Sequence, residues 1–125
     1  MKKILIVEDD TITAKIYRTT LEKAGFQIEV AANGQATLDR LADLAPDGLL
    51  VDLMMPGIGG IELLKRIRAM PPFQKLPVIC YTNAFVSKLV DEAKAAGAMH
   101  VFNKPTLTPT MLVDAFTTAT NASES

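Results

Sequence analysis

The sequence predicts an α/β fold of the (βα)5 kind, a three-layer sandwich with a five-stranded parallel sheet between two layers of helices. One observation is that five short apolar and β-branched runs alternate with five segments of helical spacing, which is typical of a parallel sheet. A second is that three of the runs are almost continuously apolar, as expected for central strands buried on both sides. These three runs are Ile4–Val7, Leu49–Val51 and Val78–Tyr81.

The strands follow one another along the whole chain. They are expected at Ile4–Val7, Gln27–Ala31, Leu49–Asp52, Val78–Thr82 and Met99–Phe102. The second run alternates polar and apolar residues, Gln-Ile-Glu-Val, so one of its faces meets solvent. We therefore expect Gln27–Ala31 at an edge of the sheet.

The segments between the strands carry apolar stripes at helical spacing. The stripes are Ala14, Tyr17, Leu21 and Ala24; Leu38, Leu41, Ala42 and Ala45; Leu63, Leu64 and Ile67; Leu89, Val90, Ala93 and Ala96; and Leu112, Ala115, Phe116 and Ala119. Gly25 and Gly97 are expected to end the first and fourth helices, because glycine readily adopts the left-handed conformation. Thr108 is the predicted N-cap of the last helix, with Pro109 in its first turn.

Composition points to one globular domain. The chain has 125 residues, 49% of them hydrophobic, which suits a single core over residues 1–120 and a polar tail or linker start at 121–125. A net charge of −1 favours neither nucleic acid nor an anionic membrane as a direct partner. The single cysteine, Cys80, fits a reducing compartment and a buried apolar role, and the short N-terminal apolar run is too brief for a signal peptide. We therefore expect a cytoplasmic location.

Polar residues that can bind ligands or take part in catalysis follow four of the predicted strands. Asp9, Asp52, Thr82 and Lys104 each stand where a strand-like run ends. In open parallel sheets ligands bind at the carboxyl ends of the strands, so we expect these side chains to face one rim. Carboxylates there can bind a hard divalent cation, lysine and threonine can hold phosphoryl oxygens, and a carboxylate can itself act as nucleophile.

At these residues the chain resembles the receiver domain of two-component response regulators, the CheY-like superfamily. The motifs are Ile-Leu-Ile-Val-Glu-Asp-Asp up to Asp10, then Val-Asp-Leu-Met-Met-Pro-Gly from Val51 with Gly60, then Tyr81-Thr82 and Lys104-Pro105. The match covers nearly the whole chain, and the motifs are specific in combination rather than singly. The resemblance implies a flavodoxin-like sheet of strand order 2-1-3-4-5.

The resemblance also assigns the phosphoryl chemistry. Asp52 would accept a phosphoryl group from a histidine kinase or a phosphotransfer protein. Thr82 would bind a phosphoryl oxygen and move inward on activation, and Lys104 would pair with the phosphoryl group and with Asp52. The bond between Lys104 and Pro105 would be cis, since cis peptide bonds are essentially confined to proline. The chain would catalyse only its own phosphorylation and dephosphorylation.

For the metal, the resemblance implies Mg²⁺ or Mn²⁺. Asp9 would ligate it directly, Glu8 largely through water, and Asp52 and the backbone carbonyl of Met54 would complete the protein ligands. Three acids in a row leave the register ambiguous. The spacing from Asp9 to Asp52 is typical of the family, which favours Glu8 and Asp9 and leaves Asp10 as a helix cap.

Three positions depart from the family pattern. Val101 stands where an aromatic switch residue is common, and Phe102 should point to the opposite face of the strand. Asn83 stands where alanine or glycine is preferred, so we hypothesise that it alters the phosphoryl lifetime. Thr106 replaces a common aromatic. We therefore also hypothesise that Thr82 and the switch positions do not couple through the usual aromatic rotamer.

The implied partners are a sensor kinase or phosphotransfer protein and an output target, or a fused effector domain, on the face of the fourth helix, last strand and last helix. A homodimer formed on phosphorylation is a further expectation. The sequence disfavours three other functions. A phosphatase acting on small substrates needs a second acid soon after Asp52, where Leu53, Met54 and Met55 stand. An interaction module that works without phosphorylation would lack one of the site residues, and none is missing. A nucleotide site would need glycines in the first strand–helix turn, where Glu8–Asp10 stand.

Two other features have simpler interpretations. His100 has no partner at ligand spacing and is expected to be structural. The run Lys65–Arg68 is basic at helical spacing and is expected to form a solvated face.

Overall fold

The computed structural model describes residues 1–124, with side chains through Asn121, and shows one five-stranded parallel sheet. The strand order is β2-β1-β3-β4-β5, as the resemblance implied. The strands are β1 (Lys3–Val7), β2 (Gln27–Ala31), β3 (Gly48–Asp52), β4 (Val78–Thr82) and β5 (His100–Asn103). The helices are α1 (Thr11–Lys23), α2 (Gly34–Leu44), α3 (Gly60–Arg68), α4 (Ser87–Ala95) and α5 (Pro109–Glu124), with the short 3₁₀ turns η1 (Pro71–Phe73) and η2 (Lys104–Thr106).

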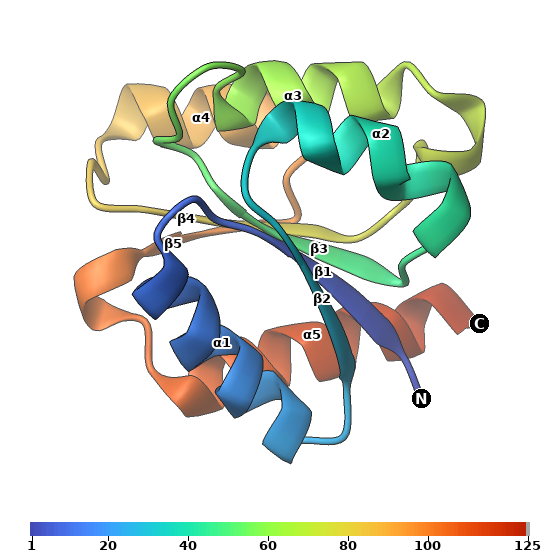
Figure 1. Cartoon of the computed structure of the whole chain (residues 1–125). Coiled ribbons are helices and arrows are strands. Elements are labelled where there is room, and N and C mark those ends of the chain that lie inside the picture. Colours follow the sequence, from blue (N-terminus) through green and yellow to red (C-terminus); the bar gives the residue numbers. More distant parts are fainter. Residues whose placement is uncertain (125) are drawn as a thin grey trace.

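The sheet lies between two helical layers (Figure 1). Helices α1 and α5 cover one face, and α2, α3 and α4 cover the other. The inner strands β1, β3 and β4 are buried along nearly their whole length, and β2 is an edge strand, as predicted. Each face has its own apolar cluster, because successive residues of a buried strand point to opposite sides.

The helix ends follow local chemistry. Asp10 is the N-cap of α1, and its carboxylate accepts the N–H groups of Ile12 and Thr13, so the predicted capping role is confirmed. Gly25 follows α1 with a φ of +98°, the left-handed conformation expected after a helix. The Thr108 hydroxyl accepts the Met111 N–H at 3.1 Å and caps α5 as predicted.

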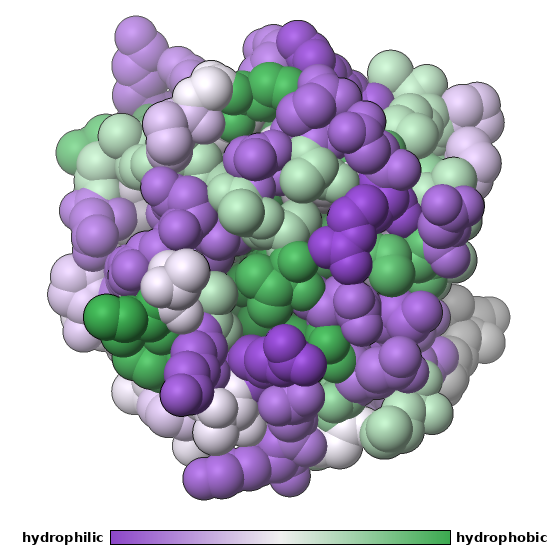
Figure 2. Space-filling view, viewed as in Figure 1, coloured by the Kyte–Doolittle hydropathy of each residue, from purple (hydrophilic) through white to green (hydrophobic). Residues whose placement is uncertain are grey.

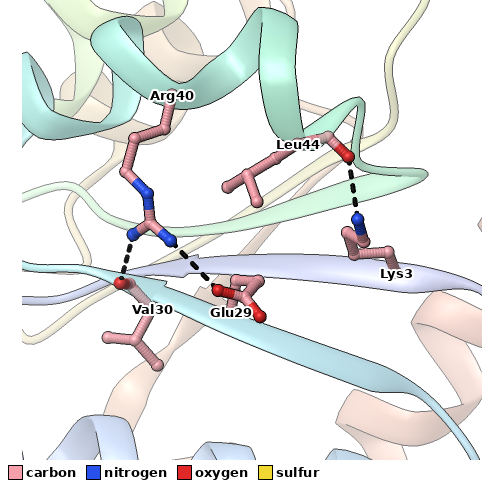
Figure 3. Close-up of polar contacts among 5 residues, drawn as sticks. All are labelled: Lys3, Glu29, Val30, Arg40 and Leu44. Carbon is pink, nitrogen blue, oxygen red and sulfur yellow. Dashed lines mark hydrogen bonds and ion pairs between the residues drawn. The ribbon is translucent and has the colours of Figure 1, made fainter.

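Two long side chains, Lys3 and Arg40, link α2 to the sheet by polar contacts (Figure 3). The Arg40 guanidinium donates to the Val30 carbonyl at 2.8 Å and pairs with Glu29 at 3.0 Å. The Lys3 ammonium donates to the carbonyl of Leu44, the last residue of α2, at 3.0 Å. The edge strand β2 and the helix above it are thus held together by polar contacts as well as by the core.

Two expectations need correction. No peptide bond within residues 1–124 is cis, so the bond between Lys104 and Pro105 is trans, the isomer that is favoured before proline as well. Arg68 does not join Lys65 and Arg66 on a solvated face. Its guanidinium donates to the carbonyls of Phe73 and Gly97 at 2.8 and 2.7 Å, because α3 ends beside both turns. Burial lowers the pKa of Arg68.

The C-terminal part of the chain continues α5 through Glu124, so the backbone of 121–124 is helical where a polar tail was expected. Ser125 lies outside the described residues. Among residues 1–124, no helix is long and apolar enough to cross a membrane. Apolar residues on the face in Figure 2 lie in small groups between hydrophilic ones.

Candidate functional site

The strand register brings the predicted site residues to one edge of the sheet. Val7 of β1 lies opposite Val51 of β3, so the chain reaches Glu8 at the level of Asp52. Further across the sheet, Asp52 pairs with Tyr81. Because all five strands are parallel, their carboxyl ends, and the side chains that follow them, meet at this edge.

Three carboxylates converge there. Glu8, Asp9 and Asp52 each offer one oxygen, and these oxygens lie within 4.8 Å of one another. Glu8 is buried, Asp52 is partly buried and Asp9 is exposed, so the cluster opens to solvent on the Asp9 side. Adjacent carboxylates repel unless a cation lies between them, and an all-oxygen donor set suits a hard cation such as Mg²⁺. The residues present therefore fit the implied metal.

Glu8 is held by two donors. The Tyr81 hydroxyl donates to Glu8 Oε1, and the backbone N–H of Asp10 donates to Oε2 at 3.1 Å. Burial raises the pKa of Glu8, with the Asp52 charge adding to the effect and the two hydrogen bonds opposing it. Burial also raises the pKa of Tyr81, so this hydroxyl keeps its proton and remains a donor at neutral pH.

Asp52 stands at the start of a tight loop. Its Oδ1 accepts the Met54 N–H at 2.9 Å, while the Leu53 N–H extends the sheet by bonding the Tyr81 carbonyl at 3.0 Å. Met54 is 57% exposed, whereas Met55 packs into the core. Gly57 has a φ of +77°, which a residue with a side chain rarely adopts. The loop therefore places Asp52 and Met54 at the carboxyl edge of the sheet and leads into α3, which begins at Gly60.

Thr82 ends the neighbouring strand. It is fully buried, and its hydroxyl accepts the Ala84 N–H at 3.0 Å. The next residue, Asn83, is exposed. The hydroxyl is thus oriented by the turn that follows β4, with Asn83 on the solvent side.

Lys104 lies on the α1 side of the edge. Its ammonium donates to the Thr13 hydroxyl at 3.5 Å and lies 5.7 Å from the centre of the Tyr81 ring. Among the described residues no ion pair joins Lys104 to Asp52. The expected lysine–aspartate pair is therefore absent from this structure, because a hydroxyl and an aromatic face hold the ammonium instead.

A comparison with known families matches the description "Response regulator receiver domain" over residues 4–117. The chain belongs to this family. The matched range includes every residue of the rim, from Glu8 to Lys104. Like the strand order, the match supports a receiver of two-component signalling with a CheY-like fold.

The relatives of this receiver differ in length. The chain is 34% identical to the phosphate regulon transcriptional regulatory protein PhoB of Rhizobium meliloti over 90% of the chain, but it spans only 49% of that protein. It is 36% identical to sporulation initiation phosphotransferase F of Bacillus subtilis, over 83% of the chain and 82% of the relative. Among solved structures, chemotaxis protein CheY4 of Vibrio cholerae matches with a TM-score of 0.89 and 28% identity, over 95% of this chain and 98% of that one.

The two residues predicted at the switch lie on opposite faces of β5. Val101 packs against the cluster on the α4 side, and Phe102 packs against the cluster on the α1 and α5 side, as strand alternation predicted. The exposed His100 stacks on Phe102 with ring centres 5.7 Å apart. Position 101 thus carries an aliphatic side chain in a core contact.

Two residues of the rim were missed by sequence reasoning. The sequence places Tyr81 in an apolar strand and in the motif Tyr81-Thr82 but predicts no contact for its hydroxyl, and it predicts no role for Thr13. A signal was available for Tyr81, since a tyrosine in a buried strand needs a partner for its hydroxyl. No comparable signal marked Thr13, whose contact with Lys104 joins residues far apart in the sequence.

Proposed function

We propose that this receiver accepts a phosphoryl group on Asp52 and changes conformation to control an output partner or domain. The observation that carries the proposal is the group of three carboxylates whose oxygens lie within 4.8 Å at the ends of β1 and β3. Thr82 and Lys104 stand at the ends of the next two strands, which supports the proposal that they bind phosphoryl oxygens. A receiver that only bound a partner would not need this set.

Glu8, Asp9, Asp52 and the Met54 carbonyl would hold Mg²⁺ or Mn²⁺ in this proposal. The cation would offset the negative charge of the carboxylates and of an incoming phosphoryl group. Met54 is suited to the role because its N–H is bound by Asp52, which ties the loop backbone to the acid cluster. The oxygen-only donor set favours these cations over zinc or copper.

The protein's own part in the transfer is positioning. An Asp52 oxygen would attack the phosphorus of a phosphohistidine on the donor, the phosphorus–nitrogen bond would break, and the imidazole nitrogen would keep the electron pair. The Thr82 hydroxyl and the Lys104 ammonium would bind equatorial phosphoryl oxygens. For this, Lys104 would leave the Thr13 hydroxyl, a contact that at 3.5 Å is weak enough to exchange.

The donor in this proposal is a sensor histidine kinase or a histidine phosphotransfer protein. Support comes from the relatives, among which are a transcriptional regulatory protein, a phosphotransferase and a sensory/regulatory protein. The output would dock on the face of α4, β5 and α5, through a target, a fused effector domain or a second phosphorylated copy. Nucleic acid and membrane are not proposed as direct partners, and the free Cys80 supports a cytoplasmic setting.

The switch is the part of the proposal that departs from the family pattern. Thr82 would move inward on phosphorylation, but Val101 cannot supply an aromatic rotamer change. A structure bound to a phosphoryl mimic tests this. We expect β4 and β5 to shift without ring rotation at Phe102 or Tyr81, and rotation of either ring in that role would overturn the idea.

A phosphatase acting on small phosphate esters is the alternative from another functional class. Aspartyl-phosphate enzymes use a second acid shortly after the nucleophile, and here Leu53, Met54 and Met55 follow Asp52. Steady turnover of a generic phosphate ester would favour this alternative.

The deciding experiment is incubation with acetyl phosphate and Mg²⁺, followed by intact mass measurement. We expect one phosphoryl adduct on the wild-type chain. The adduct should be lost in Asp52→Asn and when EDTA replaces Mg²⁺. An adduct that survives in Asp52→Asn, or a wild-type chain that takes up none, would overturn the proposal.

A further inference from the structure

The Tyr81 side chain lies beside both Glu8 and Lys104 at the carboxyl edge of the sheet. Its hydroxyl donates to Glu8 Oε1, and the Lys104 ammonium lies 5.7 Å from its ring centre. It is fully buried in the central strand β4, directly before Thr82. A buried tyrosine hydroxyl usually finds a single fixed partner, and here that partner is a carboxylate of the acid cluster.

We propose that Tyr81 is a positioning residue that sets the divalent-cation affinity of the site through Glu8. This inference rests on the proposed function, since it concerns the same cation site. It gives Tyr81 a role that the matching motifs do not assign, and Tyr81 would act through Glu8.

The first step of the argument is the fixed place of the hydroxyl. The Tyr17 ring meets the Tyr81 ring edge-on, with centres 5.1 Å apart and planes at 63°. Both flanking residues of the strand, Cys80 and Thr82, are fully buried. The ring therefore cannot turn away without disturbing the core, and the hydroxyl stays aimed at Glu8.

The second step concerns what the bond does for Glu8. A carboxylate that is only 3% exposed has lost most of its hydration, and donors must replace it. Tyr81 and the Asp10 N–H each occupy one oxygen, which leaves further lone pairs on both for a cation or its water. Losing the Tyr81 donor leaves the carboxylate less well solvated and free to change rotamer. Outer-shell partners of metal ligands act in this way.

The test compares Tyr81→Phe with Tyr17→Phe, which removes a hydroxyl from the adjoining ring and leaves the bond to Glu8 intact. Calorimetric titration with MgCl₂ should show affinity lowered about tenfold in Tyr81→Phe, a typical loss for an outer-shell partner, and unchanged in Tyr17→Phe. With acetyl phosphate, the half-saturating Mg²⁺ concentration should rise by the same factor, while the phosphorylation rate at saturating Mg²⁺ stays near wild type. A merely structural role would lower thermal stability and leave both Mg²⁺ measurements unchanged.

A second measurement keeps Tyr81 itself in place. The chain has 2 tyrosines and no tryptophan, so Tyr81 is the only tyrosine of Tyr17→Phe and reports on its own surroundings. We expect its emission to change on MgCl₂ addition, with the affinity found by calorimetry. This inference alone is overturned if the tyrosine emission does not change when Mg²⁺ binds, or if Tyr81→Phe binds Mg²⁺ as tightly as the wild-type chain or more tightly. A wild-type chain that binds no Mg²⁺ and takes up no phosphoryl group overturns the proposed function and this inference with it.

Discussion

Asp10 and Thr13 form a closed turn at the start of α1. The Asp10 carboxylate accepts the Thr13 N–H at 3.3 Å and also the Thr13 hydroxyl, whose oxygen accepts the Lys104 ammonium. These hydrogen bonds, led by the one from the hydroxyl, lower the pKa of Asp10. The third acid of the run is thus engaged by the helix rather than by the metal cluster.

This relationship separates the roles of two adjacent acids. We expect Asp10→Ala to lower the melting temperature by roughly 5 °C, the effect of a lost cap in a domain of this size, with little change in Mg²⁺ affinity. Asp9→Ala should abolish Mg²⁺ binding without a comparable loss of stability. Thermal denaturation and calorimetry check the pair. Equal loss of Mg²⁺ binding in both variants would show that Asp10 is a ligand.

The buried Glu8 makes stability depend on pH. Burial raises its pKa in the folded protein above the ordinary 4.5, so the folded state binds the proton more tightly than the unfolded state does. Glu8 therefore contributes stability at pH values below about 4.5, and this contribution is lost as the pH rises through the pKa that Glu8 has in the folded protein.

We accordingly expect Glu8→Gln to be more stable than wild type at pH 7 in metal-free buffer. The neutral amide avoids the cost of a buried charge, and the Tyr81 hydroxyl can still bond to it. Urea denaturation across pH measures the difference, which should shrink toward pH 4. A Glu8→Gln variant that is less stable at pH 7 would contradict the prediction, and Asp9→Asn, on the exposed acid, serves as control.

Gly60 permits the close approach of the loop that carries Asp52. A Cβ at position 60 would lie 2.6 Å from the Leu53 Cα and 3.1 Å from the Asp52 carbonyl oxygen, too close for backbone that cannot move aside. We expect Gly60→Ser to lose about 1–3 kcal/mol of unfolding free energy and to slow phosphorylation of Asp52. Chemical denaturation and the intact-mass assay check both effects.

The matched control is the preceding residue. A Cβ at Gly59 would meet nothing within 4 Å, and Gly59 is the N-cap of α3. Gly59→Ser should therefore keep or slightly raise stability, since serine is a good N-cap. Equal destabilisation of the two variants would show that the loop, rather than the contact with Leu53, is sensitive.

Asn83 concerns the lifetime of the phosphoryl group. It follows the buried Thr82 and is itself exposed, and in the proposed function its position borders the phosphoryl group. We expect Asn83→Ala to dephosphorylate several-fold faster, because a smaller side chain admits water more easily. Loss of the adduct with time, followed by intact mass after removal of acetyl phosphate, measures the rate. An unchanged rate would refute the role.

The order and type of the elements could be predicted from local pattern. Apolar strand runs, most of the helical stripes and the capping residues Asp10, Gly25 and Thr108 each act over a few neighbours, and the structure confirms them. Ala24, Ala42 and Ala45 were expected in the stripes but are exposed, because they lie at or near the ends of their helices. The convergence of Glu8, Asp9 and Asp52 was also predictable, because parallel strands present their carboxyl ends at one edge.

By itself, then, the sequence determined the fold class, the family and the members of the acid cluster, since these depend on periodicity, motif order and strand ends. Only the tertiary structure decided which side chains meet across elements. Three such contacts are the Tyr81 hydroxyl on Glu8, the Lys104 ammonium on Thr13 and the Arg68 guanidinium on the Gly97 carbonyl. Their partners are separated in the sequence by 73, 91 and 29 positions, respectively. Such contacts depend on how helices pack on the sheet and which rotamers that packing allows, and no local pattern records either.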